Sequence, residues 1–523
     1  MNSYAVDLET TTVGKALDPR VDRLDIIQVY DGRGPVVIVP NPKHLGGAAH
    51  LITHNGMHDL PHMMRKGLDI MQCRLDDTMD MAYLLGEPTL ALKLLARRHL
   101  GVYATEYGEG HEEGADFWNY SAQDAVLTWD LAKVLAPRLG GAKWLYETVR
   151  MPLQRILARS TLMGLKLDQH RLLALHAKVE GRHDRLEQAL VSATGIPDFN
   201  LRSPVQVAHY LFDVLGLPED PHDGRSTGEK VVGKYRDRCE WLRMLLTYRA
   251  CQSLMSRYTV PLQAMDYVTT LWSTTTADTG RLASKSRNMQ NFPLVVKQCC
   301  VARDGMKFVY GDYSQQELRL AYFFSRDPYL GQVLLEGRDM HTDRAMDTYG
   351  VVTVENRTRA KSANFAALFL GGAAIQAATL QVPVSVVEAR PLRAAKYFEW
   401  AEHQGRQPYV ETVYGHRFYI EEHDSNDPRL RDKALKKAAN SPIQGSGGNM
   451  TQYAQVLAEP LFQDLGGYVI HQEHDSVLCE VPEAIPDAEA KAALAQAMHE
   501  AVHPDVLKVI DIPAKITVGK YWG

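Results

Sequence analysis

The chain has 523 residues, of which 45% are hydrophobic and 23% charged, and its formal net charge is −5. This length is too great for a single hydrophobic core and indicates two to four domains of ordinary globular composition. The acidic balance argues against a protein that coats nucleic acid through charge alone, although basic runs occur at residues 95–100, 357–361 and 429–440. No apolar run approaches the length of a membrane span, and the first residues already look like a strand, which argues against a targeting signal.

The cysteines indicate a reducing compartment. They form no CxxC pair, and the adjacent Cys299 and Cys300 make poor disulfide partners. We therefore expect reduced thiols, a cytoplasmic protein (in the host cytoplasm if the source is viral) and no membrane partner.

Hydrophobic periodicity divides the chain into regions of different character. Up to about residue 139, apolar strands (YAVDL, IIQVY, PVVIVP) alternate with helical segments (DTMDMAYLL, LKLLARRHLG), which predicts an α/β domain ending near Gly140 and Gly141. Helical sequence follows through Met265, interrupted by a loop at residues 217–229. Strands return from Leu271, then a long helical section, then a predicted hairpin between Gly467 and Val481.

One set of carboxylates lies in the last third of the chain. The segment MKFVYGDY predicts a strand that ends near Asp312 and is followed at once by a helix. The segment GGYVIHQEHDSVLCEV predicts two strands joined at His474-Asp475-Ser476. A single aspartate at a strand end is usually a turn residue. If these strands share one sheet, however, the two aspartates meet at its edge and can hold the two metal ions that in-line phosphoryl transfer requires.

A predicted helix between these aspartates carries a stripe of four residues. Arg357, Lys361, Phe365 and Phe369 recur at every fourth position and so share one helix face. A stripe packed in the core would explain the two phenylalanines, but it would not begin with Arg and Lys. Cations near a helix N-terminus that hold phosphates, with aromatic rings beyond them that stack on a base, explain all four residues.

These segments resemble a known family. DYSQQELR, the R-x3-K-x3-F helix and the HD hairpin are similar to motifs A, B and C of family A DNA polymerases. TGRLASKSRNMQNFP, GRDMH and SPIQGSGGN match in the same order, and the similarity extends from about Met151 to the end of the chain. The resemblance implies a right-hand polymerase fold with palm, fingers and thumb.

The resemblance also assigns roles to individual residues. It implies that Asp312, Asp475 and the Tyr313 carbonyl bind metal, and that Lys361 also protonates the leaving pyrophosphate. It implies that the incoming nucleotide is held by Gln315, Glu317, His341, Arg357, Lys361, Phe365 and Phe369. Glu317 would block a ribose 2′-OH. DNA would be contacted by Arg281, Lys436, Asn440, Gln444 and His474, of which Arg281, Asn440 and Gln444 read minor-groove acceptors common to all base pairs.

Some positions depart from the family pattern. Ser476 stands where motif C usually has Glu, and we expect activity to survive because both aspartates remain. Phe369 stands where the family usually has a Tyr whose hydroxyl supports the gate glutamate, which weakens the expected exclusion of ribonucleotides. Phe365 in place of Tyr predicts discrimination against dideoxynucleotides.

A second set of carboxylates occurs near the N-terminus. Asp7-x-Glu9 ends a predicted strand, and Asn55-x3-Asp59 and Tyr120-x3-Asp124 follow at one-turn helical spacing. In this order they resemble the three motifs of DnaQ-like proofreading exonucleases, which have an RNase H-like fold. The resemblance implies that Asp7, Glu9, Asp59 and Asp124 hold two metals and that Tyr120 orients the attacking water.

The predicted fold class is therefore a multidomain α/β protein with an RNase H-like exonuclease domain followed by a right-hand polymerase. The predicted divisions are the exonuclease at 1–139, the thumb with the start of the palm at 151–270, the palm with motif A at 271–325, the fingers at 326–440 and the palm with motif C at 441–523. We expect no 5′-nuclease domain before the exonuclease.

The predicted function is template-directed DNA polymerisation with 3′–5′ proofreading, in the replication of a phage or a similar compact genome. The expected cofactor is Mg²⁺, two ions per active site, with Mn²⁺ as a substitute. The expected partners are primer-template DNA, dNTPs, single-stranded DNA 3′ ends and replisome helper proteins, and we expect a monomer. With its acidic balance and no long thumb insertion, the chain should have weak processivity and depend on low salt.

Two alternatives remain at this point. A single-subunit RNA polymerase shares the palm, but the proofreading motifs and Glu317 argue against it. A DNA-binding protein or exonuclease with a decayed polymerase site is the other, and the intact Asp312, Asp475, Arg357 and Lys361 argue against that.

Overall fold

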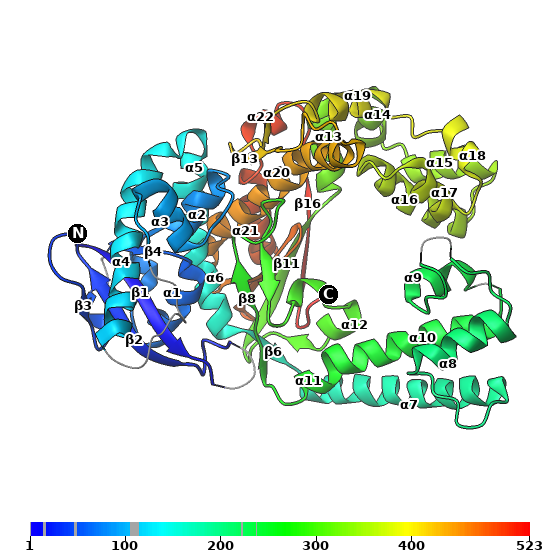
Figure 1. Ribbon diagram of the computed structural model, residues 1–523, viewed down its shortest axis with the longest axis horizontal. Coiled ribbons are helices and arrows are strands. Elements are labelled where there is room, and N and C mark those ends of the chain that lie inside the picture. Colours follow the sequence, from blue (N-terminus) through cyan, green and yellow to red (C-terminus); the bar gives the residue numbers. More distant parts are fainter. Residues whose placement is uncertain (1, 14–16, 46–49, 105–114, 221–222, 237) are drawn as a thin grey trace. The chain divides into compact units, whose positions relative to one another are not determined.

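The computed structural model describes residues 2–13, 17–45, 50–104, 115–220, 223–236 and 238–523, and for residues 115–121 it describes the backbone alone. Contacts divide the chain into two compact units (Figure 1). Unit 1 comprises residues 1–164, 269–291 and 305–519, and unit 2 comprises residues 165–268, 292–304 and 520–523. The domain divisions predicted from the sequence are finer than these two units and stay predictions.

The N-terminal part of unit 1 is built on a five-stranded sheet in the order β3-β2-β1-β4-β5. Strands β1, β4 and β5 are parallel, while β2 and β3 are antiparallel to their neighbours. Helix α4 packs against β1 and β2. The predicted α/β character is confirmed, although the predicted third strand shrinks to two exposed residues. The strands are β1 (Ser3–Thr11), β2 (Arg23–Tyr30), β3 (Val37–Ile38), β4 (His50–Thr53) and β5 (Arg74–Asp77), and the helices are α1 (Gly56–Arg65), α2 (Thr78–Leu84), α3 (Leu92–Leu100), α4 (Ala115–Leu135), α5 (Lys143–Leu145) and α6 (Met151–Met163).

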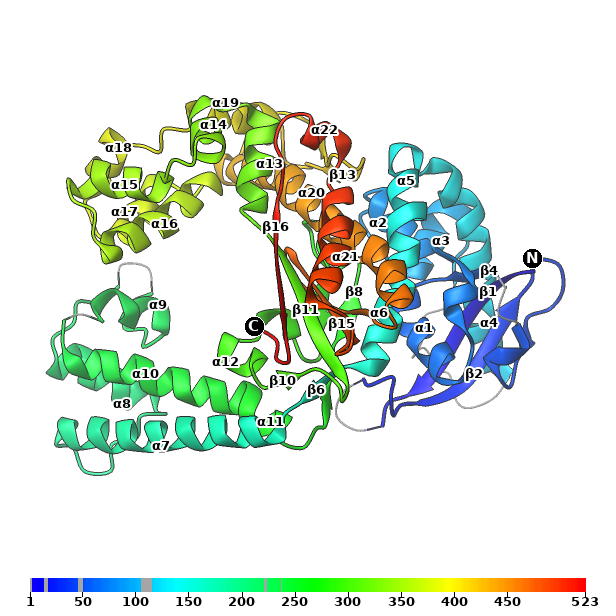
Figure 2. The same cartoon turned by 180° about the vertical axis from the view of Figure 1, so that it is seen from behind.

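The second sheet of unit 1 has four antiparallel strands in the order β14-β15-β11-β16. Its strands are β11 (Met306–Tyr313), β14 (Tyr468–Glu473), β15 (Ser476–Pro482) and β16 (Ala514–Gly519). Strands β14 and β15 are joined by a two-residue turn, as the sequence predicted. Helices α20 (Pro428–Asp464) and α21 (Asp487–Glu500) pack against this sheet (Figure 2).

Helices dominate the chain between β11 and β14. Helices α15 to α18 enclose a small core of their own, formed by Ala345, Ala360, Ala363, Ala377, Leu380 and Val387. The predicted helical section is thus confirmed. Its elements are α13 (Gln316–Ser325), α14 (Pro328–Leu335), α15 (Met340–Tyr349), α16 (Val354–Leu368), α17 (Ala373–Leu380), α18 (Val384–Ala389), α19 (Ala395–Gln404) and the hairpin of β12 (Tyr409–Glu411) and β13 (Arg417–Tyr419), and the remaining elements of unit 1 are β8 (Leu271–Ser273), β9 (Ala283–Lys285) and α22 (Pro504–Leu507).

Unit 2 consists mainly of two long helices that pack on each other. These are α7 (Gln169–Thr194) and α10 (Glu240–Leu254), both predicted from the sequence. Phe199, Tyr210 and Trp241 pack with leucines from both helices into a separate core. A three-stranded sheet in the order β10-β6-β7 completes the unit. The other elements are α8 (Pro204–Ala208), α9 (Glu229–Val232), α11 (Val260–Leu262), α12 (Leu294–Lys297), β6 (Leu165–Leu167), β7 (Tyr267–Val268) and β10 (Cys300–Val301).

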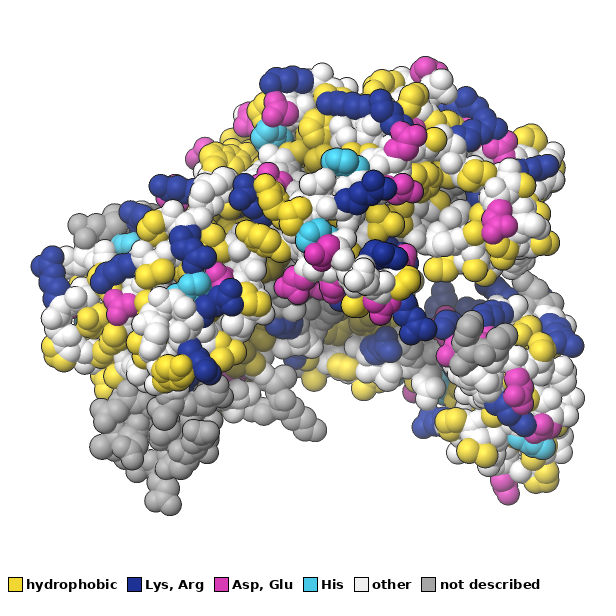
Figure 3. Space-filling view, turned by 45° about the horizontal axis from the view of Figure 1, so that its top comes forward, with side chains coloured by type: hydrophobic (Ala, Val, Ile, Leu, Met, Phe, Trp, Pro, Cys, Tyr) yellow, Lys and Arg dark blue, Asp and Glu magenta, His cyan; other side chains and the backbone are white. Residues whose placement is uncertain are grey.

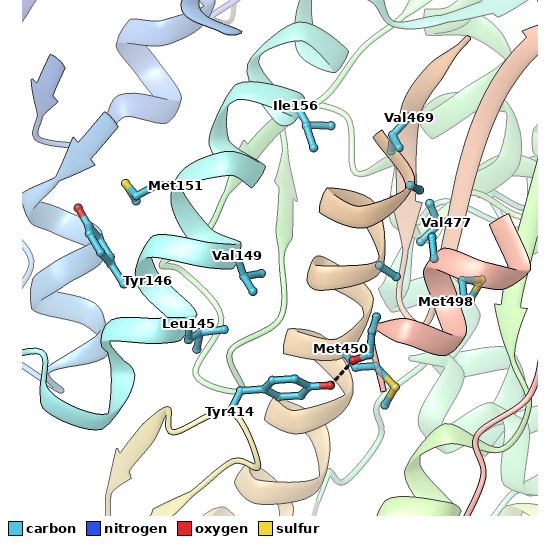
Figure 4. Close-up of a cluster of buried hydrophobic side chains, with 14 of the residues drawn as sticks. Leu145, Tyr146, Val149, Met151, Ile156, Tyr414, Met450, Val469, Val477 and Met498 are labelled. Carbon is cyan, nitrogen blue, oxygen red and sulfur yellow. Dashed lines mark hydrogen bonds between the residues drawn. The ribbon is translucent and has the colours of Figure 1, made fainter. Parts of the chain in front are cut away.

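One hydrophobic core joins the two sheets of unit 1. Buried side chains of the first sheet, of α6 and the turns before it, and of the second sheet belong to a single cluster. In Figure 4, Leu145, Val149 and Ile156 lie on the side of this cluster that faces Met450 and Val469. The predicted boundary near Gly140 therefore separates two sheets that share a common core.

All six cysteines lie in the described part of the chain and are free thiols, as expected. None of the described helices combines the length and apolar character needed to cross a bilayer.

A buried ion pair crosses this shared core. The Arg150 Nε donates to Asp80 Oδ1 at 2.7 Å, and both side chains are fully buried. Gln154 Nε2 and Thr274 Oγ1 each donate to Asp80 Oδ2 at 2.8 Å, and Arg150 also donates to the Thr274 carbonyl. Because every partner is on a different element, this network fixes α2, α6 and the segment after β8 relative to one another.

We expect Asp80→Ala to lower the free energy of unfolding by about 3–5 kcal/mol, because it leaves the Arg150 charge buried without its partner. The measurement is the denaturant midpoint followed by circular dichroism. The matched control is Asp130→Ala, which removes an exposed ion pair with Lys133 and should cost no more than about 1 kcal/mol. Equal losses in the two variants would contradict this role for the network.

Candidate active sites

Asp312 lies on β11, and Asp475 lies in the turn that joins β14 to β15 in the same four-stranded sheet. Asp312 on β11 pairs with Ser476 on β15, the residue that follows Asp475. The Tyr313 N–H donates to the Asp475 carbonyl at 3.2 Å, which ties the two segments together. The sheet therefore brings these two predicted residues together. The Tyr313 side chain is buried and donates to the Met498 carbonyl, so its hydroxyl does not serve a ligand.

A third carboxylate lies beside them that the sequence motifs did not single out. Glu473 pairs with Ser476 across the hairpin and is largely buried. Burial, with the charges of Asp312, Glu473 and Asp475, raises the pKa of Tyr310 to about 12 against the lowering effect of a hydrogen bond with Ser476. All three carboxylates are therefore near the Tyr310 hydroxyl. The signal that could have revealed Glu473 is its position directly before the hairpin turn.

Next to Asp475 is a cavity of about 440 Å³. It brings together predicted residues from segments far apart in the sequence. These are Arg281, Gln315, Glu317, His341, Lys361, Phe365, His474 and Asp475. The lining residues that the sequence motifs did not single out are Gln316, Leu318, Met340, Asn364 and Leu368. Among these, Asn364 Nδ2 lies 3.2 Å from His341 Nδ1 and so orients the histidine ring.

The stripe predicted on one helix is only partly confirmed. Helix α16 ends at Leu368, and Phe369 is its cap residue with non-helical dihedrals (φ −89°, ψ 19°). Phe369 therefore does not continue the helix face and does not line the cavity, because the chain turns at Leu370, which has positive φ. Lys361 and Phe365 do line the cavity.

Arg357 also lies outside the cavity lining, because it is paired elsewhere. Its Nε donates to Asp339 Oδ2 at 2.7 Å, and Asp339 also caps α15. Burial alone would raise the pKa of Asp339, but hydrogen bonds from Arg357, Thr342 and the His341 backbone lower it overall. Asp339 thus holds the guanidinium that the sequence assigned to phosphate.

Arg281 and Glu317 form an ion pair with each other at the cavity wall. Glycines on α20 let that helix pack closely against Gln316 and Arg281. A Cβ at Gly447 would lie 2.4 Å from Gln316 Oε1, and one at Gly448 would lie 3.1 Å from Arg281 Cγ. Packing therefore favours glycine at positions 447 and 448 of the SPIQGSGGN segment, apart from any contact with a ligand.

The remaining predicted DNA contacts on α20 do not reach the cavity. Lys436 is paired with Asp432 at 2.6 Å. Asn440 keeps a buried Oδ1 with no hydrogen bond from the described residues, and Gln444 is partly exposed. Figure 3 shows acidic and basic side chains interspersed over one face of the molecule, as the near-balanced composition implies.

The N-terminal carboxylates converge from three elements. Asp7 and Glu9 share one face of β1, because they are two residues apart on a strand. Asp59 comes from α1 and Asp124 from α4. Burial raises the pKa of Asp7, and the charges of Asp124 and Glu9 raise it further. Burial likewise raises the pKa of Asp59, with contributions from Asp7, Asp77 and Glu9.

Two further residues bear on this carboxylate group. Tyr120 lies on α4, but its side chain is outside the described residues. Lys93, which the sequence motifs did not single out, places its Nζ 3.9 Å from Asp124 Oδ1. A lysine among the leucines of LALKLL is the signal that could have revealed it.

The chemistry of both carboxylate sets fits hard divalent cations. Carboxylate oxygens are the ligands that Mg²⁺ prefers. In the N-terminal set, the raised pKa values of Asp7, Asp59 and Asp124 are also what buried carboxylates show when no cation compensates their charge. Among described residues, three ligand atoms lie within 4.8 Å of one another only at His183, Asp184 and Glu187 of α7. Both carboxylate sets would therefore have to draw closer around an ion.

We expect the chelator-treated protein to lose stability as the pH rises from about 4 to about 7. Burial raises the pKa of Asp124 to about 6, so between these values the native state holds a proton that the unfolded state has released. Asp124→Asn should flatten this dependence by on the order of 2–3 kcal/mol, read from denaturant midpoints across the pH range. Mg²⁺ should flatten it as well, because it stabilises the ionised carboxylates. If the unaltered protein and Asp124→Asn lose stability with pH in parallel, Asp124 is not the group whose raised pKa causes the pH dependence.

Known proteins are similar to this chain in sequence over most of its length. The chain is 33% identical over 486 residues to the thermostable DNA polymerase I of Thermus thermophilus, covering 87% of this chain and 56% of that protein. It is 28% identical over 478 residues to DNA polymerase I of Deinococcus radiodurans, covering 86% of this chain and 48% of that protein. The chain thus spans about half the length of these relatives. They are bacterial and give no support to the predicted phage source.

A solved structure shows the same fold. It is the POL domain of Pol1 from M. smegmatis in complex with DNA primer-template and dNTP, with a TM-score of 0.86, 22% identity, and coverage of 99% of this chain and 95% of that one. The expected α/β fold is confirmed at this level. A family model for DNA polymerase family A also matches residues 169–523. Because this match covers more than half of the sequence, the chain belongs to DNA polymerase family A.

Proposed function

We propose that the chain is a template-directed DNA polymerase that also degrades DNA from its 3′ end. The observation that carries the first activity is that Asp312 on β11 lies next to the turn that carries Asp475, and that Asp475 lines a cavity together with Lys361 and Phe365. The chain thereby combines carboxylates for metal, a cation for phosphate and a ring for a base. Family membership and the bacterial DNA polymerase I relatives support the same activity.

Polymerisation here is an in-line phosphoryl transfer. The primer 3′ hydroxyl releases its proton to water and its oxygen forms a bond to the α-phosphorus of a dNTP, the bond from that phosphorus to its bridging oxygen breaks, and pyrophosphate leaves. Lys361 would hold the phosphates and give a proton to the leaving oxygen, and Phe365 would stack on the base. Asp312 and Asp475 would hold Mg²⁺, which neutralises the charge that develops on phosphate oxygens.

Two ion pairs would have to exchange partners when substrates bind. Arg357 would leave Asp339 for the triphosphate, and Arg281 would leave Glu317 for the primer-template minor groove. Such exchanges are favourable because exposed pairs contribute little by themselves, at most about 1 kcal/mol. Glu317, once released, would be placed to exclude a 2′-hydroxyl.

The proposed exonuclease rests on the convergence of Asp7, Glu9, Asp59 and Asp124. In the proposed hydrolysis a water oxygen bonds to the terminal phosphorus, the bond to the 3′ oxygen of the preceding nucleotide breaks, and that oxygen takes a proton. The carboxylates would hold the metal ions that support this step, and Tyr120 would orient the water. Unpaired 3′ ends suit such a site because they need no unstacking from a duplex.

Other parts of the original expectation stay predictions. These are the helper proteins, the monomeric state, the low processivity and the use of Mg²⁺ rather than Mn²⁺. The alternatives also stay open to experiment. An RNA polymerase would extend a primer with rNTPs, and a decayed polymerase would not extend at all.

We expect Asp312→Ala and Asp475→Ala to abolish primer extension with dNTPs and Mg²⁺ while leaving 3′ degradation intact. Asp7→Ala should do the reverse, because each carboxylate set serves one reaction. The assay is a gel of end-labelled primer on a defined template. Asp505→Ala, an exposed carboxylate on α22, is the matched control and should keep both reactions. If Asp312→Ala extends the primer as well as the unaltered protein does, Asp312 does not belong to the polymerase site.

We expect Glu317→Ala to raise rNTP incorporation relative to dNTP incorporation by about 10-fold or more, because removal of the side chain makes room for the 2′-hydroxyl. Glu317→Gln keeps the shape of the side chain and should keep most of the exclusion. The measurement is the ratio of kcat/KM for matched rNTP and dNTP. If Ala and Gln variants discriminate equally well, Glu317 is not a steric gate.

A further inference from the structure

Lys93 is a largely buried cation beside the N-terminal carboxylate group. Its side chain is 14% exposed, and its Nζ lies 3.9 Å from Asp124 Oδ1. It also acts on Asp7, whose pKa it lowers against the larger raising effects of burial, Asp124 and Glu9. Lys93 therefore faces carboxylates from both β1 and α4.

The position of Lys93 in α3 is unfavourable for a lysine whose only role is to stabilise that helix. It is the second residue of α3, where the positive end of the helix dipole disfavours a cation. Burying an ammonium group also requires compensating partners. Arg97 and Arg98, near the C-terminal end of the same helix, are placed where the dipole and solvent both favour them, and both are exposed. Lys93 is thus the one basic residue of α3 that points into the carboxylate group.

Lys93 would stop serving as the counter-ion of Asp124 once the carboxylates held a metal ion. The carboxylates that would bind a divalent cation are those that face Lys93, so the cation would displace the ammonium group from Asp124 by repulsion. An ammonium group on a flexible stem of four carbons can then turn toward a nearby anion. The anion that such a site would hold is the phosphate of the DNA end.

We propose that Lys93 is a catalytic residue of the exonuclease site, whose ammonium group contacts the scissile phosphate and stabilises the charge of the transition state. This inference rests on the exonuclease activity proposed above. The atoms that react are unchanged: water forms the new bond to phosphorus, and the preceding 3′ oxygen leaves and takes the proton. Lys93 transfers no proton in this step and contributes electrostatic stabilisation alone.

The test compares Lys93→Met and Lys93→Arg in the Asp312→Ala background, which removes a carboxylate of the polymerase site. The first readout is kcat and KM for degradation of a single-stranded oligothymidylate. The second is the Kd of Mn²⁺ alone, measured by calorimetry. Lys133→Met, an exposed lysine on α4, is the matched control and should change neither.

The expected result is a fall in kcat of about 100-fold or more for Lys93→Met, the size seen when one charge-stabilising donor is removed. Mn²⁺ should bind Lys93→Met as tightly as before or more tightly, since a repelling cation has gone. Lys93→Arg, which keeps the charge, should recover a large part of kcat.

Three outcomes would overturn the proposal. If kcat is unchanged and Mn²⁺ binds more tightly, Lys93 is only a counter-ion of the carboxylates. If kcat and Mn²⁺ affinity fall together, Lys93 only holds the carboxylates in place. If the chain with Lys93 intact degrades no DNA, the exonuclease proposal fails as well. If Asp7→Ala abolishes degradation but Lys93→Met retains it, the exonuclease proposal stands and only the role of Lys93 is wrong.

Discussion

The constraint on which the rest of this structure depends is electrostatic: like-charged carboxylates must be held near one another against their mutual repulsion. In the four-stranded sheet this is achieved by register. Val309 and Tyr313 on β11, and Val477 and Cys479 on β15, are buried side chains of the core. A slip of one residue would turn these side chains to the other face of the sheet, so hydrophobic burial fixes the position of Asp312.

The same electrostatic demand explains the ion pairs around the cavity. Arg281 pairs with Glu317 and Arg357 pairs with Asp339, so these three groups that are expected to meet a substrate already have partners. These partners balance partly exposed charges in the free protein. They also mean that binding is an exchange of partners, which makes the affinity for an anionic ligand depend on both members of each pair.

The shared core gives the two candidate sites a common frame. The first and second sheets of unit 1 contribute to one hydrophobic cluster, and the Arg150–Asp80 network crosses it without a solvent-exposed atom on either side chain. A disturbance at this network should therefore reach both sites. By contrast, unit 2 has its own core and its own sheet.

The sequence by itself determined the features that depend on interactions between residues close together in the chain. The strand that carries Asp312, the hairpin that carries Asp475 and the helix face with Lys361 and Phe365 follow from periods of two and 3.6 residues and from the order of the motifs. Only the tertiary structure decided which distant segments meet. In the folded chain α16 ends before Phe369, and Arg357 pairs with Asp339. Lys93 lies beside the N-terminal carboxylates, and Glu473 lies beside Asp312 and Asp475. The physical reason is that a local pattern states which face of an element is apolar, whereas the partner of that face is set by the packing of the whole core.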